Sequence, residues 1–301
     1  MALALAITAL VAVVIHAAAS GSRYRRLARR LKRESERSGR LRGEILPLIR
    51  PLWTDLIDRR GSAGTRHADA LPITSRGEQG EDLVLLALFV AADGDRMGSF
   101  IEAGGYDGRT NSPTWLLESI GWQGLLVEPS PKLAALARGR RNSVVVEAAL
   151  GRRGCTGTAE LVAYEPTDPN RPTDLASHLA GADSGKSTPD ERNAQRVRVP
   201  LRALGDVLRD HQDLAPLDLL VLDVEGGELD ALDGLDLDHN RPRIILIEDH
   251  GGSASQHDLL QNAGYRYVCR FDFNRLYIRS DEDALLAAAK DRLALDQVDL
   301  G

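Results

Sequence analysis

From residue 73 onward, short runs of apolar residues alternate with amphipathic stretches. Short apolar runs are typical of buried strands, and the amphipathic stretches between them are typical of helices that cross over a parallel sheet. The pattern therefore predicts an α/β fold with a mostly parallel sheet and a terminal hairpin. The predicted strands are residues 99–103, 124–128, 144–148, 217–224 and 243–248, and the hairpin is 264–270 with 275–279.

Helices are expected between these strands. Residues 81–90, 112–120 and 131–140 have helical patterns, a further helix begins near Gly227, and a last one covers 281–296. Proline opens the helix at 131, where a first-turn proline is favoured. Between the third and fourth strands, residues 165–196 are rich in Pro, Asp, Ser and Gly. This insertion is either a mobile lid or disordered, and both interpretations stay open.

The amino terminus carries a different pattern. Residues 2–19 are almost all apolar and hold no formal charge. At about 1.5 Å per helical residue, this run is long enough for the roughly 30 Å core of a bilayer. A signal peptide would carry its positive charges before the apolar run, whereas here they follow it. A buried core helix is the other alternative. We expect residues 1–21 to form a single transmembrane anchor.

Charge is unevenly distributed along the chain. Residues 21–42 hold ten Arg or Lys and two Glu, whereas the whole chain has a net charge of −6. The positive-inside rule then predicts a single-pass protein of the cell membrane with its amino terminus outside and its catalytic domain in the cytoplasm. Residues 22–72 are interpreted as a basic juxtamembrane helix and linker, which can contact anionic lipids or a second copy of the chain. The acidic remainder argues against nucleic-acid binding.

The chain has only two cysteines, Cys155 and Cys269, in different segments. They form no CxxC pair and no zinc-ligand spacing, so a reducing compartment is favoured, although one bridge between them stays open.

Polar residues and glycines follow the predicted strands at their carboxyl ends. In an open parallel sheet, ligands bind beyond these ends, near the switch in strand order. The first strand continues into EAGGYDG at 102–108, where glycines let the backbone approach a ligand. Amide donors are expected where the next helix begins, around Asn111 and Ser112. The second strand ends in Glu128, whose carboxylate can accept hydrogen bonds from both hydroxyls of a ribose.

The chemistry of this loop discriminates between two cofactor classes. A dinucleotide site needs G-x-G-x-x-G to hold a pyrophosphate, and this loop lacks that opening. Carboxylates such as Glu102 and Asp107 would repel a pyrophosphate, whereas they attract the sulfonium and ammonium of S-adenosylmethionine. The sequence also lacks a G-x-S-x-G elbow and a P-loop.

The later strands end in further candidates for chemistry. Asp223 is expected near the transferred methyl group, Glu225 as a base or metal ligand, and His250 as a general base. Asp223, Glu248 and His250 are also candidate ligands for Mg²⁺ or Mn²⁺, because carboxylates and imidazole suit these cations. Glu228 is interpreted as a helix-capping charge.

Five ordered motifs resemble the FkbM-type methyltransferases. They are QGEDL at 79–83, FIEAGGYDG at 100–108, GWQGLLVEP at 121–129, LDVEGGE at 222–228 and IE at 247–248. The resemblance spans residues 73–279, so we assign 73–301 to the methyltransferase domain. It implies a class I, Rossmann-like methyltransferase fold with seven strands, and methyl transfer from S-adenosylmethionine, usually to an oxygen. Glu102 stands where relatives often have Asp.

The resemblance places Glu102, Gly104, Gly108 and Glu128 on the cofactor. With the neighbouring strand ends, the expected cofactor set is Glu102, Gly104, Tyr106, Asp107, Gly108, Asn111, Ser112, Glu128, Pro129, Ala148 and Ala149. Glu81 and Asp82 are expected to cap a helix, and only the resemblance favours a place for them at the site.

The expected activity is O-methylation of a hydroxyl of a sugar, a glycan or a lipid-linked precursor, and a soluble metabolite is also compatible. Two alternatives remain. One is a catalytically inactive methyltransferase fold that serves as a scaffold at the membrane, and the other is a dinucleotide-dependent oxidoreductase.

Overall fold

A computed structural model describes residues 75–94, 96–164, 177–182, 194–249 and 254–293. All of them belong to the second of the chain's two units, Arg60–Gly301. The expected anchor (1–21), the basic segment (22–72), most of the insertion at 165–196 and His250 lie outside the described residues.

Within the parts of the chain that the structure describes, no helix is long and apolar enough to span a bilayer. This finding contradicts the expected localisation as a single-pass membrane protein with a cytoplasmic catalytic domain. The apolar run on which that expectation rested, residues 2–19, is not among the described residues.

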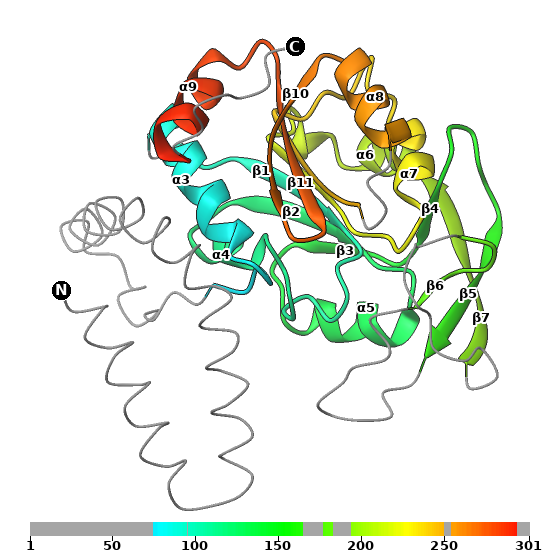
Figure 1. Ribbon diagram of the computed structural model, residues 1–301. Coiled ribbons are helices and arrows are strands. Elements are labelled where there is room, and N and C mark those ends of the chain that lie inside the picture. The colour runs from blue at the N-terminus through cyan, green and yellow to red at the C-terminus, as the bar shows by residue number, and fades with distance from the viewer. Residues whose placement is uncertain (1–74, 95, 165–176, 183–193, 250–253, 294–301) are drawn as a thin grey trace, which may run out of the picture. The chain divides into compact units, whose positions relative to one another are not determined.

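A seven-stranded sheet forms the centre of the described fold (Figure 1). Its order is β10-β11-β9-β8-β1-β2-β3, and only β11 runs against its neighbours. The strands are β1 (Ser99–Ala103), β2 (Gln123–Val127), β3 (Val144–Val146), β8 (Leu219–Leu222), β9 (Ile244–Glu248), β10 (Tyr265–Phe271) and β11 (Asn274–Arg279). The predicted mixed α/β fold and its terminal hairpin are confirmed.

The strand order creates a switch point beside β1. The chain runs from β1 outward through β2 to β3, and it later returns to place β8 on the other side of β1. Connections that leave β1 and β8 therefore turn in opposite directions, which opens a crevice above their carboxyl ends.

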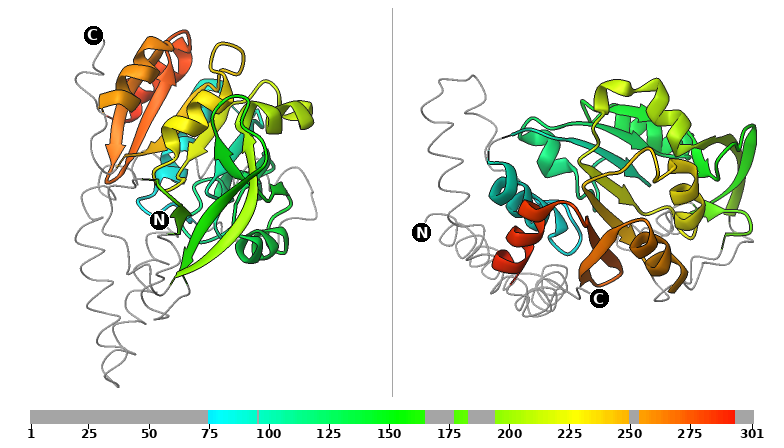
Figure 2. Two further views of the ribbon diagram at one scale, coloured as in Figure 1. Left: turned by 90° about the vertical axis from the view of Figure 1, so that its right-hand side faces the viewer. Right: turned by 90° about the horizontal axis from the view of Figure 1, so that it is seen from above.

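Helices cover both faces of this sheet. They are α3 (Glu81–Asp93), α4 (Trp115–Ser119), α5 (Pro131–Arg138), α6 (Leu204–Asp210), α7 (Glu228–Leu235), α8 (Ala254–Asn262), α9 (Asp283–Arg292) and the short 3₁₀ turn η3 (Gln212–Leu214). Figures 1 and 2 show α3 and α9 side by side, and they pack on each other. Apolar residues of α6, α7 and α8 share one core with alternate residues of the strands, such as Ile101 and Leu220.

A second, four-stranded sheet was not predicted. Its order is β4-β7-β5-β6, with β4 at Ala149–Gly151, β5 at Thr158–Tyr164, β6 at His178–Leu179 and β7 at Ala194–Ala203. Within the segment 165–196, His178 and Leu179 form β6, and residues 194–196 lie at the start of β7. Ala149, Leu161 and Val199 form its small core.

Candidate active site

A pocket lies where the strand ends of the large sheet meet the second sheet. Its wall includes residues that follow β1, β2 and β8, namely Gly104, Tyr106, Glu128, Pro129, Asp223 and Glu225. Ala148, which precedes β4, and Ala149, its first residue, also line the pocket. The structure thus brings eight of the predicted site residues to one pocket, at the switch point where a ligand of an open sheet is expected.

Gly104 fixes the close contact between the ends of β1 and β8. It adopts a φ of +83°, and its amide donates to the carbonyl of Val127 at 2.9 Å. A Cβ at this position would lie 1.7 Å from the carbonyl oxygen of Asp223. Only glycine therefore allows the two strand ends to approach in this way.

Replacing Gly104 with alanine is expected to lower the free energy of unfolding by more than about 4 kcal/mol, because the backbone contact with Asp223 must break. Gly154→Ala is the matched control, since Gly154 has a similar φ of +76° but no atom within 4 Å of the added Cβ. That control is expected to cost about 1–2 kcal/mol. Urea unfolding of both variants measures the difference, and equal losses would contradict this interpretation of the contact.

Glu128 is a buried carboxylate on the pocket wall, and two backbone amides fix its orientation. It is 5% exposed, and its Oε2 accepts a hydrogen bond from the amide of Tyr106 at 2.9 Å. Its Oε1 accepts from the amide of Ser130 at 2.8 Å. Burial raises the pKa of Glu128 to about 7, the two amides oppose this rise, and the charge of Asp223 adds to it. The carboxylate is therefore oriented by the loop after β1 and by the start of α5.

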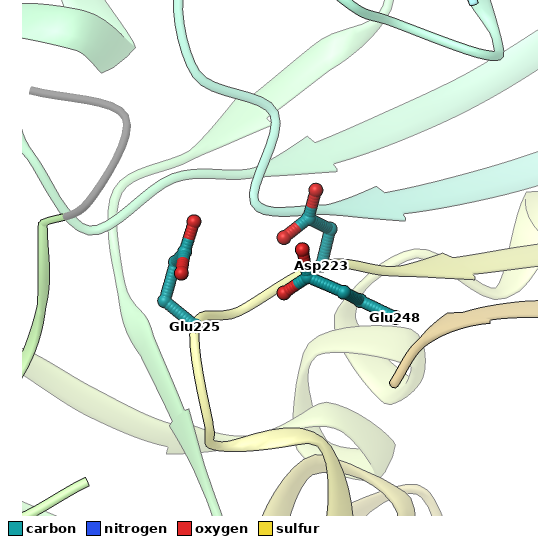
Figure 3. A group of neighbouring side chains, drawn as sticks. All are labelled: Asp223, Glu225 and Glu248. Atoms are coloured by element: carbon teal, nitrogen blue, oxygen red, sulfur yellow. The ribbon is translucent and has the colours of Figure 1, made fainter. Parts of the chain in front are cut away.

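Three further acids converge beside the pocket (Figure 3). One carboxylate oxygen from each of Asp223, Glu225 and Glu248 lies within 4.8 Å of the other two. The predicted cluster of Asp223 and Glu248 is thus present, with Glu225 as its third member, whereas His250 lies outside the described residues. Ionised carboxylates at this separation repel one another, so a cation placed among them would reduce the repulsion.

Other predicted cofactor residues lie behind the loop that follows β1, and they do not line the pocket. Glu102 is 3% exposed, accepts hydrogen bonds from Ser112 and Thr114, and pairs with Arg141. Burial raises the pKa of Glu102, against the charge of Arg141. Ser112 also accepts a hydrogen bond from Arg141 at 3.0 Å. These groups support the loop from within, and direct contact with a cofactor stays a prediction for them.

The outer residues of the same loop also make internal contacts. Asp107 accepts hydrogen bonds from the amides of Arg109 and Thr110 at 2.9 and 2.7 Å, and these amides hold its pKa below the ordinary value. Asn111 contacts Glu78 at 3.3 Å. A Cβ on Gly108 would lie 2.9 Å from the Cα of Ala137 in α5, so this glycine lets the helix pack against the loop.

Buried acids in the first turns of α7 and α3 accept hydrogen bonds from backbone amides that precede these helices. Glu228 accepts hydrogen bonds from the amides of Val224 and Gly226, both at 3.1 Å. Asp82 accepts from the amides of Arg76 and Gly77 at the start of α3.

The other half of the pocket wall was not predicted. The second sheet contributes Leu150, Leu161, Ser177, His178 and Leu179. Alternating polar and apolar residues in β5 and β7 were the available signal, because period two is typical of a strand with one exposed face. The short β6 lies within a polar segment and carries no such signal.

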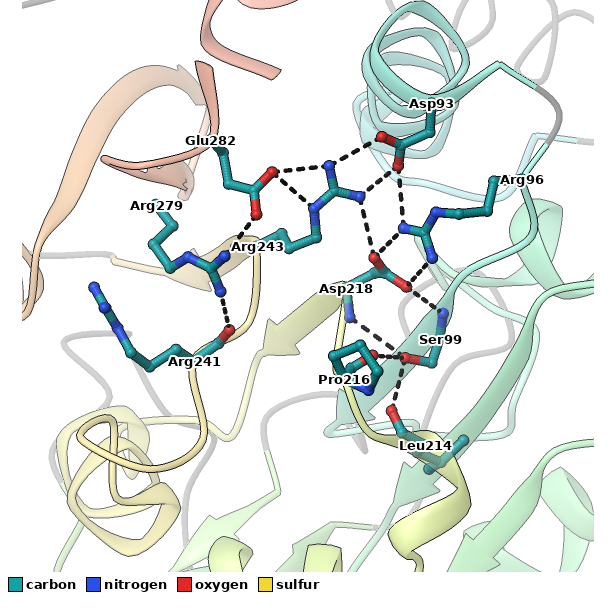
Figure 4. Close-up of polar contacts among 10 residues, drawn as sticks. All are labelled: Asp93, Arg96, Ser99, Leu214, Pro216, Asp218, Arg241, Arg243, Arg279 and Glu282. Atoms are coloured by element: carbon teal, nitrogen blue, oxygen red, sulfur yellow. Dashed lines mark hydrogen bonds and ion pairs between the residues drawn. The ribbon is translucent and has the colours of Figure 1, made fainter. Parts of the chain in front are cut away.

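A polar network fixes the opposite ends of the same strands (Figure 4). Asp218, which precedes β8, accepts a hydrogen bond from the amide of Ser99 at 2.9 Å and pairs with Arg96 and Arg243. Arg243 in turn pairs with Glu282, beside α9, at 2.8 Å. The network therefore ties β1, β8 and α9 together at the amino-terminal edge of the sheet.

Removing the Asp218 carboxylate is expected to be strongly destabilising. The side chain is 3% exposed, and Asp218→Ala leaves two guanidinium groups and an amide without this acceptor. We expect a loss of about 3–5 kcal/mol in the free energy of unfolding, as for a broken buried ion pair. Asp210→Ala is the control, because Asp210 pairs with Arg202 on the surface and should cause no measurable change. Thermal and urea unfolding compare the two variants, and equal stabilities would contradict the role of the network.

Comparisons with known proteins agree with this geometry. The chain matches the methyltransferase FkbM domain over residues 102–267, a range that contains every described strand end of the pocket. It is also similar to methyltransferase sdnD of Sordaria araneosa, with 47% identity over 74 residues, which cover 21% of this chain and 29% of that protein. No solved structure gives a significant match. The chain belongs to the FkbM methyltransferase domain family.

Proposed function

We propose that the protein transfers a methyl group from S-adenosylmethionine to a hydroxyl of a small molecule, with a sugar or glycan as the expected acceptor class. The single observation that carries the cofactor assignment is the set of carboxylates at the pocket, with Glu128, Asp223 and Glu225 on its wall and Glu248 clustered with the last two. Such a site favours a cationic ligand and disfavours the pyrophosphate of a dinucleotide.

The residues of the pocket fit the parts of this cofactor. Both oxygens of Glu128 are oriented by backbone amides, so the carboxylate is preorganised to accept hydrogen bonds from ribose hydroxyls. The backbone at Gly104 has no side chain to exclude a ligand. When bound, S-adenosylmethionine supplies an electrophilic methyl group on a cationic sulfur. The protein's contribution is then to position the acceptor against that group and to offset the charge.

A divalent cation is the second cationic ligand that the acid cluster suits. Asp223, Glu225 and Glu248 offer three carboxylate oxygens within 4.8 Å of one another, and hard oxygen ligands are those that Mg²⁺ and Mn²⁺ prefer. Titration of chelator-treated protein with MgCl₂ and MnCl₂, with and without S-adenosylmethionine, discriminates between the ligands. Unchanged cofactor binding without metal assigns the cluster to the cofactor, whereas binding that requires metal assigns it to a cation.

The function is tested by incubating the full chain with S-adenosylmethionine labelled in its methyl group and a panel of sugars, glycans and hydroxylated metabolites. We expect label on an acceptor oxygen, identified from the mass and the fragment pattern of the product. Label on nitrogen or carbon would contradict the O-methyltransferase assignment. Cofactor binding without transfer to any acceptor would favour the inactive alternative.

A further inference from the structure

The second sheet gives the pocket a wall of different chemistry from the strand ends. It adds apolar side chains, Ser177 and one imidazole, that of His178, to the pocket that Glu128, Asp223 and Glu225 also line. Among the residues that the structure describes, His178 is the only histidine on this wall. Figure 1 shows β5, β6 and β7 beside β4, next to the carboxyl end of β3.

His178 is held in place by the second sheet. It lies in β6 and pairs with Val162 of β5 in antiparallel register. Its side chain is buried, at 6% exposure, and its ring lies 6.0 Å from the ring of Tyr164. The imidazole is therefore fixed at the pocket surface by backbone pairing and ring packing, which is the arrangement that a proton-accepting group requires.

We propose that His178 accepts the proton of the acceptor hydroxyl and that the second sheet forms the acceptor side of the pocket. This inference rests on the proposed function. In the step, the hydroxyl oxygen forms a bond to the methyl carbon while the carbon–sulfur bond breaks and its electron pair passes to sulfur. The hydroxyl proton passes to the neutral imidazole. The products are the methyl ether, the neutral thioether and imidazolium.

The acidic wall of the pocket suits imidazole as this base. Before transfer, the positive charge is on the sulfonium, and after transfer it is on His178. The net charge of the site is unchanged, so the acidic wall that stabilises the bound sulfonium also stabilises the imidazolium.

The test compares two ligands that differ by one charge. Full-length protein with isotope-labelled histidine is titrated with acid by NMR in the presence of S-adenosylmethionine or of S-adenosylhomocysteine, which lacks the methyl group and the positive charge. Among the residues that the structure describes, Tyr164 of β5 packs near His178, and the titratable groups Glu128, Asp223 and Glu225 line the same pocket. They are the same in both complexes, so the comparison isolates the sulfonium charge.

We expect the imidazole of His178 to titrate at a lower pH with S-adenosylmethionine than with S-adenosylhomocysteine, because a nearby positive charge disfavours protonation. His211 and His239, which lie beyond α6 and α7 near the amino-terminal edge of the sheet, should titrate alike in both complexes and serve as controls. If the acid titration of His178 has the same midpoint in both ligand-saturated complexes, the inference is overturned but the proposed function is not. Failure of both ligands to bind folded protein would overturn the proposed function, and the inference with it.

Discussion

Replacing Glu128 with alanine is expected to weaken the binding of S-adenosylmethionine by about 100-fold or more. A hydrogen bond to a charged group contributes about 1.5–3 kcal/mol, and each 1.4 kcal/mol corresponds to a factor of ten. The variant loses a carboxylate that two backbone amides orient toward the pocket. Isothermal titration calorimetry measures the dissociation constant directly.

Two further variants make this result interpretable. Glu128→Gln removes the charge but keeps the size of the side chain. Thermal unfolding of this variant checks that any loss of affinity does not come from misfolding. Glu147→Ala removes a carboxylate that follows β3, pairs with Arg138 at the surface and does not line the pocket. We expect the Glu147 variant to bind like the wild type. Wild-type affinity in a folded Glu128→Ala variant would contradict the assigned role.

The affinity should also depend on pH through Glu128. Burial raises the pKa of this carboxyl to about 7 in the free protein, whereas ribose hydroxyls are bound by its ionised form. Below pH 7 the carboxyl must therefore lose a proton when the ligand binds. We expect the dissociation constant to rise as the pH falls from about 7 toward 5.5, approaching tenfold per pH unit. Calorimetry between pH 5.5 and 7.5 tests this slope, and a flat profile would contradict it.

A large effect on stability is also expected for Arg141→Ala, at about 3–5 kcal/mol of unfolding free energy. The guanidinium is fully buried and pairs with Glu102 and Glu118, and it also donates to the carbonyl of Gly108 at 3.1 Å. Its removal leaves two carboxylates without their counter-charge. Arg138→Ala is the control, at the end of the preceding helix α5, because Arg138 is half exposed and its pair with Glu147 contributes about 0–1 kcal/mol. Urea unfolding compares the two, and equal losses would show that Arg141 does not anchor the loop.

Arg141 also explains why several predicted residues lie behind the pocket. It binds Glu102, Ser112 and Thr114 from below the loop that follows β1. The sequence pattern placed Glu102 at the end of a strand, but alternate residues of a strand point to opposite faces. A prediction of strand ends alone does not determine which of two neighbouring residues reaches the ligand.

The large sheet could be predicted from the sequence because its strands are continuous apolar runs between helical segments. For example, residues 99–103 were predicted as a strand and form β1. The second sheet could not be predicted in the same way, since β7 alternates charged and apolar residues and β6 has only two residues. Its pairing joins segments distant in sequence, such as Val162 with Arg196 and with His178, and tertiary contacts set that register.

The observed boundaries of the shorter elements differ from the predicted ones for local reasons. Residues 112–120 were expected to be helical, yet α4 begins only at Trp115. The side chains of Ser112 and Thr114 bind the buried Glu102 and hold this segment as a turn before the helix. A side chain that bonds elsewhere in the fold overrides the local helical pattern.

The central claim is that this pocket binds S-adenosylmethionine. Its most direct test is calorimetric titration of the folded full-length protein with S-adenosylmethionine, in parallel with the Glu128→Ala and Glu147→Ala variants. We predict one bound molecule per chain in the wild type and in the Glu147 variant, and binding at least about 100-fold weaker in the Glu128 variant. No heat of binding to folded wild-type protein, at ligand concentrations up to the millimolar range, would contradict the claim.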